Sequence, residues 1–174
     1  NWSRSFTACI KAKPRSYQGG SYSTLFAQGL LNTNGWNLFM NQDTGKYTFR
    51  MTTSTNRDAS TTTSYSAGTW TTLCGRFDAS NTNKNLTVWY DGILQGAVNY
   101  TESASNPAKP LTIGLIRNFD DASYVSPFNG TIDWVKVYNR SLSDEEIVLI
   151  NNSQDFVINN RETIANEIWS VAVT

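Results

Sequence analysis

Histidine is absent from this sequence, and glutamate is scarce. Without histidine, the chain can hold neither a Ser-His-Asp triad nor a Cys-His pair. Glycoside hydrolysis needs a different device, two carboxylates at a fixed separation across the scissile bond. The glutamates form no such pair on a predicted strand; they are Glu102, Glu145, Glu146, Glu162 and Glu167. The sequence therefore predicts a domain that is not an enzyme.

Charged residues are also few, and their signs balance. They make up 16% of the chain, with 14 Lys plus Arg against 14 Asp plus Glu. A neutral chain has no general electrostatic attraction to nucleic acid or to acidic lipid. No apolar run approaches the length of a membrane-spanning helix. We therefore expect neither nucleic-acid binding nor membrane insertion.

Short segments with alternating apolar residues follow one another along most of the chain. In segment 6–14 the apolar face consists of Phe6, Ala8, Ile10 and Ala12. In segment 45–51 it consists of Tyr47, Phe49 and Met51, and Arg50 lies on the opposite face. This period of two, with turn residues at short spacing, indicates an all-β sandwich.

Turn residues separate these predicted strands. Asp91-Gly92 is a strong signal for a two-residue hairpin. The Ser- and Thr-rich stretch 52–66 favours a hairpin at a sheet edge, because Thr favours strands. Asn56-Arg57-Asp58 is the predicted turn of that hairpin. Residues 102–110 and 117–127 are typical of polar loops.

The most specific segment is FNGTIDWVKVYNRSLSDEEI, residues 128–147. It predicts a turn, a strand, a polar turn and a helix in that order. Ser143 is a natural N-cap, and Glu146 completes a capping box three residues later. This succession resembles the closing signature of laminin-G-like, concanavalin A-like jelly rolls.

The resemblance extends upstream in the same order. FTACIKAKP (6–14), AGTWTTLCGRFD (67–78), NLTVWYDG (85–92) and PLTIG (110–114) are each similar to a strand segment of that family. The similarity covers residues 6–150. It implies an all-β fold, a two-sheet antiparallel jelly-roll sandwich with one short helix near 144–150. It also implies a non-catalytic, extracellular domain at a cell or virion surface.

A disulfide and a calcium site are two further implications. The strands that contain Cys9 and Cys74 are neighbours in the family, which implies a disulfide between them; the alternative is two buried thiols. Many relatives bind calcium near a loop rim, and Asp120, Asp121 and Asp133 are the candidate ligands here. The alternative is that these carboxylates bond only local backbone and solvent. No cofactor is required.

Four aromatic residues are candidates for carbohydrate binding, because a flat ring can stack on the face of a sugar. Trp89 and Trp134 each lie opposite the apolar face of a predicted strand. Phe119 and Tyr124 lie in the loop at 117–127. The alternative for each is a structural role, with the ring covered by a loop or by the C-terminal tail.

The sequence contains N-x-[ST] sequons that could carry glycans in a secreted protein. They begin at Asn1, Asn85, Asn99, Asn129, Asn139 and Asn151. A chain so rich in Asn, Ser and Thr generates several of these by chance. We therefore expect glycosylation at some of them if the source organism modifies its surface proteins.

Residues 1–152 form the predicted jelly roll, and residues 153–174 form a tail with strand character. Trp169, Val171 and Val173 alternate with polar or small residues there. We expect this tail to fill an open sheet edge, either in its own domain or in a neighbouring copy. Two functions follow: a glycan-binding or adhesive domain, or a structural subunit of a surface filament, appendage or virion that assembles by tail-strand exchange. The expected partners are therefore glycans or copies of the chain itself.

Overall fold

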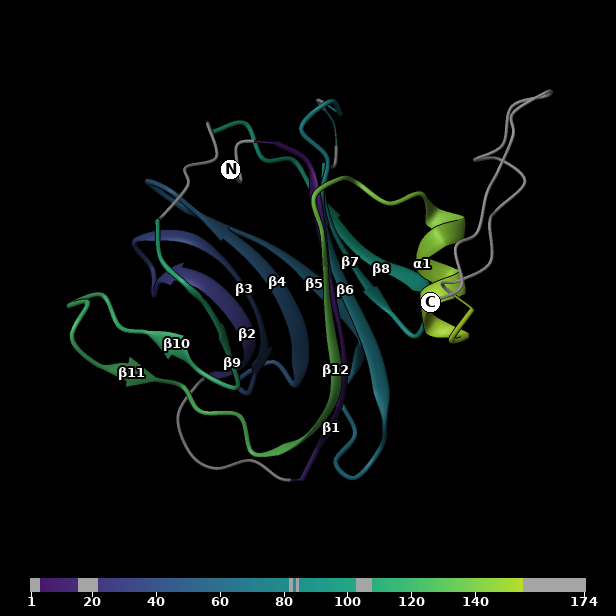
Figure 1. The fold of residues 1–174 in the computed structure, drawn as a ribbon, viewed down its shortest axis with the longest axis horizontal. Coiled ribbons are helices and arrows are strands. Elements are labelled where there is room, and N and C mark those ends of the chain that lie inside the picture. The colour runs from purple at the N-terminus through teal and green to yellow at the C-terminus, as the bar shows by residue number, and fades with distance from the viewer. Residues whose placement is uncertain (1–3, 16–21, 82, 84, 103–107, 155–174) are drawn as a thin grey trace, which may run out of the picture.

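Two β-sheets face each other in the computed structural model, and one short helix lies against the outer face of one of them (Figure 1). The structure describes residues 4–15, 22–81, 83, 85–102 and 108–154. This is the predicted all-β, jelly-roll sandwich with one short helix, and the fold prediction is confirmed.

The five-stranded sheet contains the strand that starts the described chain. Its order is β12 (Gly130–Tyr138), β1 (Phe6–Pro14), β6 (Thr71–Phe77), β7 (Leu86–Tyr90) and β8 (Ile93–Val98). All its pairs are antiparallel. The helix α1 (Asp144–Asn151) follows β12 in the chain.

The seven-stranded sheet forms the other layer. Its order is β11 (Tyr124–Val125), β10 (Ile116–Arg117), β2 (Tyr22–Leu30), β3 (Asn34–Asn41), β4 (Lys46–Thr52) and β5 (Asn56–Ser64), and β9 (Leu111–Ile113) also pairs with β2. The short β10–β2 pairing is parallel, whereas the other pairs in this sheet are antiparallel. β10 and β11 form a hairpin that overlaps residues 117–127, which the sequence predicted to be a loop.

The main core fills the space between the sheets, as the alternation predicted. The predicted apolar faces of β1 and β4 are buried. Trp36 of β3 is 2% exposed and packs among Phe6, Phe26 and Phe49. A Cβ atom added at Gly75 would lie 2.3 Å from the Phe49 ring, so the close approach of the two sheets requires glycine there.

The predicted hairpin turn at Asp91-Gly92 is confirmed, whereas the turn predicted at 56–58 is wrong. Asp91 and Gly92 have φ values of 50° and 77°, as a two-residue hairpin of mirror-image type requires. Residues 53–55 form the other turn, and β5 begins at Asn56. The physical reason is the pairing of Arg50 on β4 with Asp58 on β5, which lie opposite each other in register.

Helix α1 begins as the sequence predicted, with a capping box at Ser143 and Glu146. Leu142, Ile147 and Ile150 are buried against the outer face of the five-stranded sheet. They cover a second apolar cluster that contains Cys9, Cys74 and Trp89. A sandwich with one outer face covered in this way has two cores, one on each side of the five-stranded sheet.

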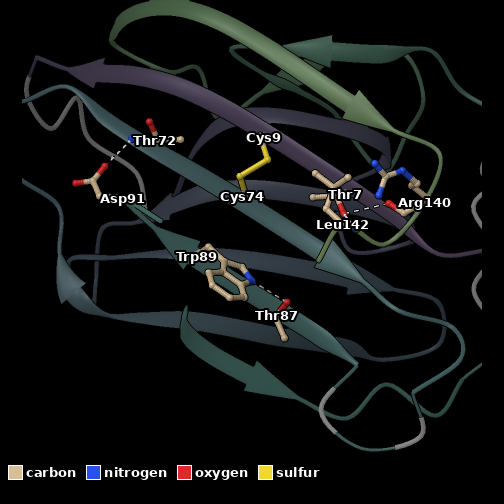
Figure 2. Close-up of a disulfide and its surroundings, with 9 residues drawn as sticks. All are labelled: Thr7, Cys9, Thr72, Cys74, Thr87, Trp89, Asp91, Arg140 and Leu142. Carbon is tan, nitrogen blue, oxygen red and sulfur yellow. Dashed lines mark hydrogen bonds between the residues drawn. A yellow bond between two sulfur atoms is a disulfide. The ribbon is translucent and has the colours of Figure 1, made fainter. Parts of the chain in front are cut away.

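Cys9 and Cys74 form a disulfide within this second cluster, and the predicted pairing is confirmed (Figure 2). The two residues lie directly opposite each other on β1 and β6. Both are buried, at 0% and 1% exposure. The bond therefore links two neighbouring strands beneath α1.

The predicted strand in residues 155–174 lies outside the described residues, so the tail-exchange hypothesis stays a prediction. Among the residues that the structure describes, no helix is long and apolar enough to cross a membrane. The Ser- and Thr-rich strand β5 is the edge of its sheet, as predicted.

We expect the Cys9→Ala/Cys74→Ala variant to be about 4 kcal/mol less stable to urea than the oxidised protein. The bond closes a loop with a sequence separation of 65 residues, which restricts the unfolded chain. Urea unfolding with and without reductant measures the difference. Thiol titration of the unfolded, unreduced wild type is the control, and two reactive thiols there would contradict the disulfide.

The carboxylate of Glu102 should make stability depend on pH. Hydroxyl donors on Thr53 and then Thr55 lower the pKa of Glu102 from 4.5 to about 2, because they bind its charged form. Because the pKa of Glu102 is lower in the folded state, its ionised carboxylate stabilises the fold fully above about pH 4.5. This stabilisation is lost as the pH falls through about 2. The stability gap between wild type and Glu102→Gln should therefore shrink between pH 5 and pH 2. Thermal unfolding at each pH measures this difference, and Asp43→Asn is the control because it also removes an exposed carboxylate. A stability difference that does not change with pH would contradict the lowered pKa of Glu102.

Candidate functional site

Trp89 is not available as a sugar-binding ring, so that prediction is wrong. It is 4% exposed and lies in the cluster that α1 covers. Its indole N–H donates to Thr87 Oγ1 at 3.2 Å (Figure 2). The Arg76 guanidinium lies 5.2 Å from the ring centroid. The alternation correctly placed Trp89 outside the main core. Helix α1 covers that face of the sheet, however, so Trp89 is buried in the second apolar cluster.

Trp134 lies on β12, at the border of the same cluster. It is half-buried against the residues beneath α1. The Lys136 ammonium lies 4.9 Å from its ring centroid. Part of this indole therefore remains at the surface, beside a cation.

Phe119 and Tyr124 lie together on the β10–β11 hairpin and are both exposed. Their exposed fractions are 69% and 50%. The hairpin is on the opposite side of the molecule from α1 (Figure 1). Of the four aromatic residues predicted to bind carbohydrate, Phe119 and Tyr124 are the two that are exposed to solvent, and both lie on this hairpin.

Local hydrogen bonds fix the shape of this hairpin. The Asn118 N–H donates to the Ser123 carbonyl at 2.9 Å, and the Asp121 N–H donates to the Asn118 carbonyl at 3.0 Å. The Asp120 carboxylate accepts from the N–H groups of Ala122 and Ser123. The bond from Ala122 is the main reason that the pKa of Asp120 is lowered. Phe119 therefore projects from a turn with a defined backbone.

A cluster of charged side chains lies beside Tyr124. Arg117 lies opposite Tyr124 in the hairpin, and its guanidinium is 5.3 Å from the phenol ring centroid. Asp121 pairs with Arg117 at 2.9 Å and also accepts from the Lys109 ammonium. The Lys109 bond is the main reason that the pKa of Asp121 is lowered. Tyr124 thus has a cation near its ring while half of the residue remains exposed, an arrangement that suits stacking on a sugar.

The structure does not bring the three candidate calcium ligands together. Asp133 is on β12 and pairs with Lys11 at 3.5 Å. Asp120 and Asp121 are on the β10–β11 hairpin and are occupied by local donors. Across residues 4–15, 22–81, 83, 85–102 and 108–154, no group of three or more His, Cys, Asp or Glu side chains is placed to hold a metal ion.

A polar cluster around Arg50 lies on the outer face of the seven-stranded sheet, and it was not predicted from the sequence. The guanidinium donates to both oxygens of Asp58 at 2.6 Å and to Asn32 Oδ1 at 3.0 Å. It also lies 4.9 Å from the Phe39 ring centroid. The alternation on β4 was the signal, because it placed Arg50 away from the core. The Arg50 guanidinium already donates to Asp58 and Asn32, so the cluster stabilises this face and is a poor site for a ligand.

A polar groove of about 750 Å³ lies beside the N-terminal end of α1. The pairs that line it include Arg76 with Asp144, at 2.7 Å, and Arg140 with Glu146. Arg76 also donates to the Leu142 carbonyl at 2.9 Å. These bonds hold α1 on the sheet, so the charged side chains that line the groove have a structural role.

The sequons differ in accessibility. Asn85 is 6% exposed, and its side chain exchanges two hydrogen bonds with the Tyr100 backbone, so glycosylation there is not compatible with this fold. Asn99 and Asn139 are exposed. The remaining described acceptors, Asn129 and Asn151, are half-buried, and Asn1 lies outside the described residues.

Comparison with known families gives one match over most of the chain. A family model described as the concanavalin A-like lectin/glucanases superfamily matches residues 1–148. A search of curated protein sequences found no significant match.

Solved structures share the fold at low sequence identity. The CBM40 of Ruminococcus gnavus IT-sialidase, bound to α2,3 sialyllactose, has a TM-score of 0.70 and 15% identity over 85% of this chain and 83% of that chain. Domain 4 of AbnA, a GH43 extracellular arabinanase from Geobacillus stearothermophilus in complex with arabinotriose, has a TM-score of 0.67 and 17% identity over 83% and 65%. A heptameric SAP-like pentraxin from Limulus polyphemus has a TM-score of 0.66 and 15% identity over 85% and 70%.

Replacement of Trp89 by Ala should lower the free energy of unfolding by about 3–5 kcal/mol, the usual cost of removing a buried indole. Urea unfolding of the oxidised protein measures this. Phe119→Ala is the matched aromatic control and should change stability by no more than about 0.5 kcal/mol, because Phe119 is exposed. Equal stability of Trp89→Ala and wild type would show that α1 does not cover this residue.

Proposed function

The chain belongs to the concanavalin A-like lectin/glucanases superfamily, and we propose that it is a non-catalytic, extracellular domain that binds glycans through the β10–β11 hairpin. The observation that carries the proposal is the pair of exposed rings, Phe119 and Tyr124, on one hydrogen-bonded hairpin. No pair of glutamates lies on a predicted strand of the sequence, which supports a binding role rather than glycoside hydrolysis. The buried disulfide supports an oxidising, extracellular location.

Tyr124 is the centre of the proposed contact. Its ring can stack on the apolar face of a pyranose or furanose while Arg117 remains on the hairpin beneath it. The Asp120 carboxylate and the Asn118 amide lie on the same turn, and their local hydrogen bonds hold its shape. Because the turn is already ordered by its own hydrogen bonds, binding costs little additional conformational entropy.

Two structures of the same fold support a glycan as the partner. One is described in complex with sialyllactose and the other with arabinotriose. Both sugars expose ring faces and several hydroxyls, which match a ring and polar side chains on one hairpin. These two oligosaccharides are therefore the first ligands to test, within a wider glycan array.

We expect Tyr124→Ala and Phe119→Ala each to weaken glycan binding about threefold to tenfold, and the double variant to weaken it further. The range corresponds to the usual contribution of one aromatic contact. Ile93→Ala is the matched control, because Ile93 is 63% exposed on the distant strand β8. Isothermal titration with the array's best ligand measures the affinities.

Two results would contradict different parts of the proposal. If the double variant binds as tightly as wild type, the glycan site is not on this hairpin. If wild type binds no glycan and the purified chain elutes as large assemblies, the alternative function as a self-assembling surface subunit is favoured instead.

A further inference from the structure

The outer face of the five-stranded sheet carries lysines and tryptophans where α1 does not cover it. Lys11 and Lys13 follow Cys9 along β1 at intervals of two residues, so all three lie on the same face. Cys9 is beneath α1, whereas both lysines are half-buried beyond it. The sheet therefore passes from an apolar, covered region to a basic, accessible one along a single strand.

Each lysine on this face lies near an indole. The Lys13 ammonium is 5.0 Å and the Lys11 ammonium 5.9 Å from the ring centroid of Trp70, which is 40% exposed. On the other side of β1, the Lys136 ammonium is 4.9 Å from the Trp134 ring centroid. We call this set of five residues the Lys–Trp strip.

Strand register places the two indoles on opposite sides of β1. Lys11 is opposite Trp134 on β12 and opposite Thr72 on β6, and Trp70 precedes Thr72 by two residues. Two strand spacings therefore separate the rings, or roughly 10 Å across the sheet. The strip is a shallow surface that crosses β1, and it suits an extended ligand better than a compact one.

The five residues of the strip include three lysines and no acidic residue, although the chain is neutral overall. Asp133 pairs with Lys11 at 3.5 Å, and both side chains are partly exposed. Asp91 lies near the end of β6 and accepts from the Thr72 N–H. Within the described residues, Lys13 has no ion-pair partner, so its charge is available to a ligand.

We propose that the Lys–Trp strip binds an acidic polysaccharide, one with carboxylate or sulfate groups on its sugar rings. The indoles supply faces for the sugar rings, and the ammonium groups beside them attract the anionic substituents. A nucleic acid is a poorer match, because it gains most of its affinity from many phosphate contacts and this face offers few cations. The strip is on the other sheet from the β10–β11 hairpin, so either surface can function without the other.

Dextran sulfate and uncharged dextran are a matched pair of probes, since they share a backbone and differ in charge. We expect wild type to bind dextran sulfate, to bind dextran far more weakly, and to lose affinity as sodium chloride is raised. Lys13→Gln and Trp70→Ala should each weaken binding about threefold, and Lys11→Gln/Lys13→Gln more strongly. Arg57→Gln is the control, because it removes one positive charge from exposed strand β5.

Trp70→Ala distinguishes the proposal from general charge attraction, because it leaves every charge in place. Far-UV circular dichroism and thermal unfolding confirm that each variant is folded before binding is compared. Tyr124→Ala should bind dextran sulfate like wild type, which separates this surface from the hairpin. Any of four results overturns the proposal: no binding of dextran sulfate, unchanged binding by Trp70→Ala, an equal loss with Arg57→Gln, or tighter binding of oligothymidylate at the same salt concentration.

Discussion

The packing of α1 on the five-stranded sheet is the contact on which the outer surface of this domain depends. Leu142, Ile147 and Ile150 cover the disulfide and Trp89, and the Arg76–Asp144 pair holds the start of the helix against the sheet. Without this cover, a disulfide and an indole would face solvent. With it, one half of the sheet is interior and the other half is left as an accessible face, so the helix decides which aromatic residues can meet a ligand.

Contacts between an aromatic ring and a cation recur across the molecule. Their role depends on whether the ring is buried or exposed. Arg50 lies beside Phe39 and Arg76 beside Trp89; both rings are buried, and the two arginines form ion pairs that hold strands and helix in place. Arg117 beside Tyr124 is on a hairpin where the ring remains half-exposed. The second kind leaves part of the ring exposed, and the proposed glycan contact depends on that exposed part.

Local patterns in the sequence predicted much of the fold. Strand β1 was placed at its observed bounds by the resemblance of residues 6–14 to a family strand, and the alternation of its apolar residues predicted which face is in the core. The helix start was also predictable, since a capping box is encoded within four residues. The pairing of Cys9 with Cys74 followed from the resemblance to a known family, which supplied the neighbouring order of their strands.

The errors concern features that arise only from tertiary contacts. Alternation placed Trp89 outside the main core but carried no information that a helix from the far end of the chain would cover it. The turn near Asp58 was displaced because its pairing with Arg50 extends β5 over a turn-prone sequence. For the candidate site, the sequence identified Phe119 and Tyr124, whereas the Arg117 guanidinium near the Tyr124 ring became apparent only when the strands were paired.

The position of the disulfide also bears on how the domain would respond to tension. The chain between Cys9 and Cys74 includes β2, β3, β4 and β5, most of the seven-stranded sheet. A pulling force applied through the two ends of the domain cannot extend that loop while the bond is intact. With a separation of 65 residues at about 3.4 Å each, roughly 220 Å of chain is thus withheld from mechanical extension. Under tension the chain after Cys74 would extend, while β2, β3, β4 and β5 would stay within a closed loop.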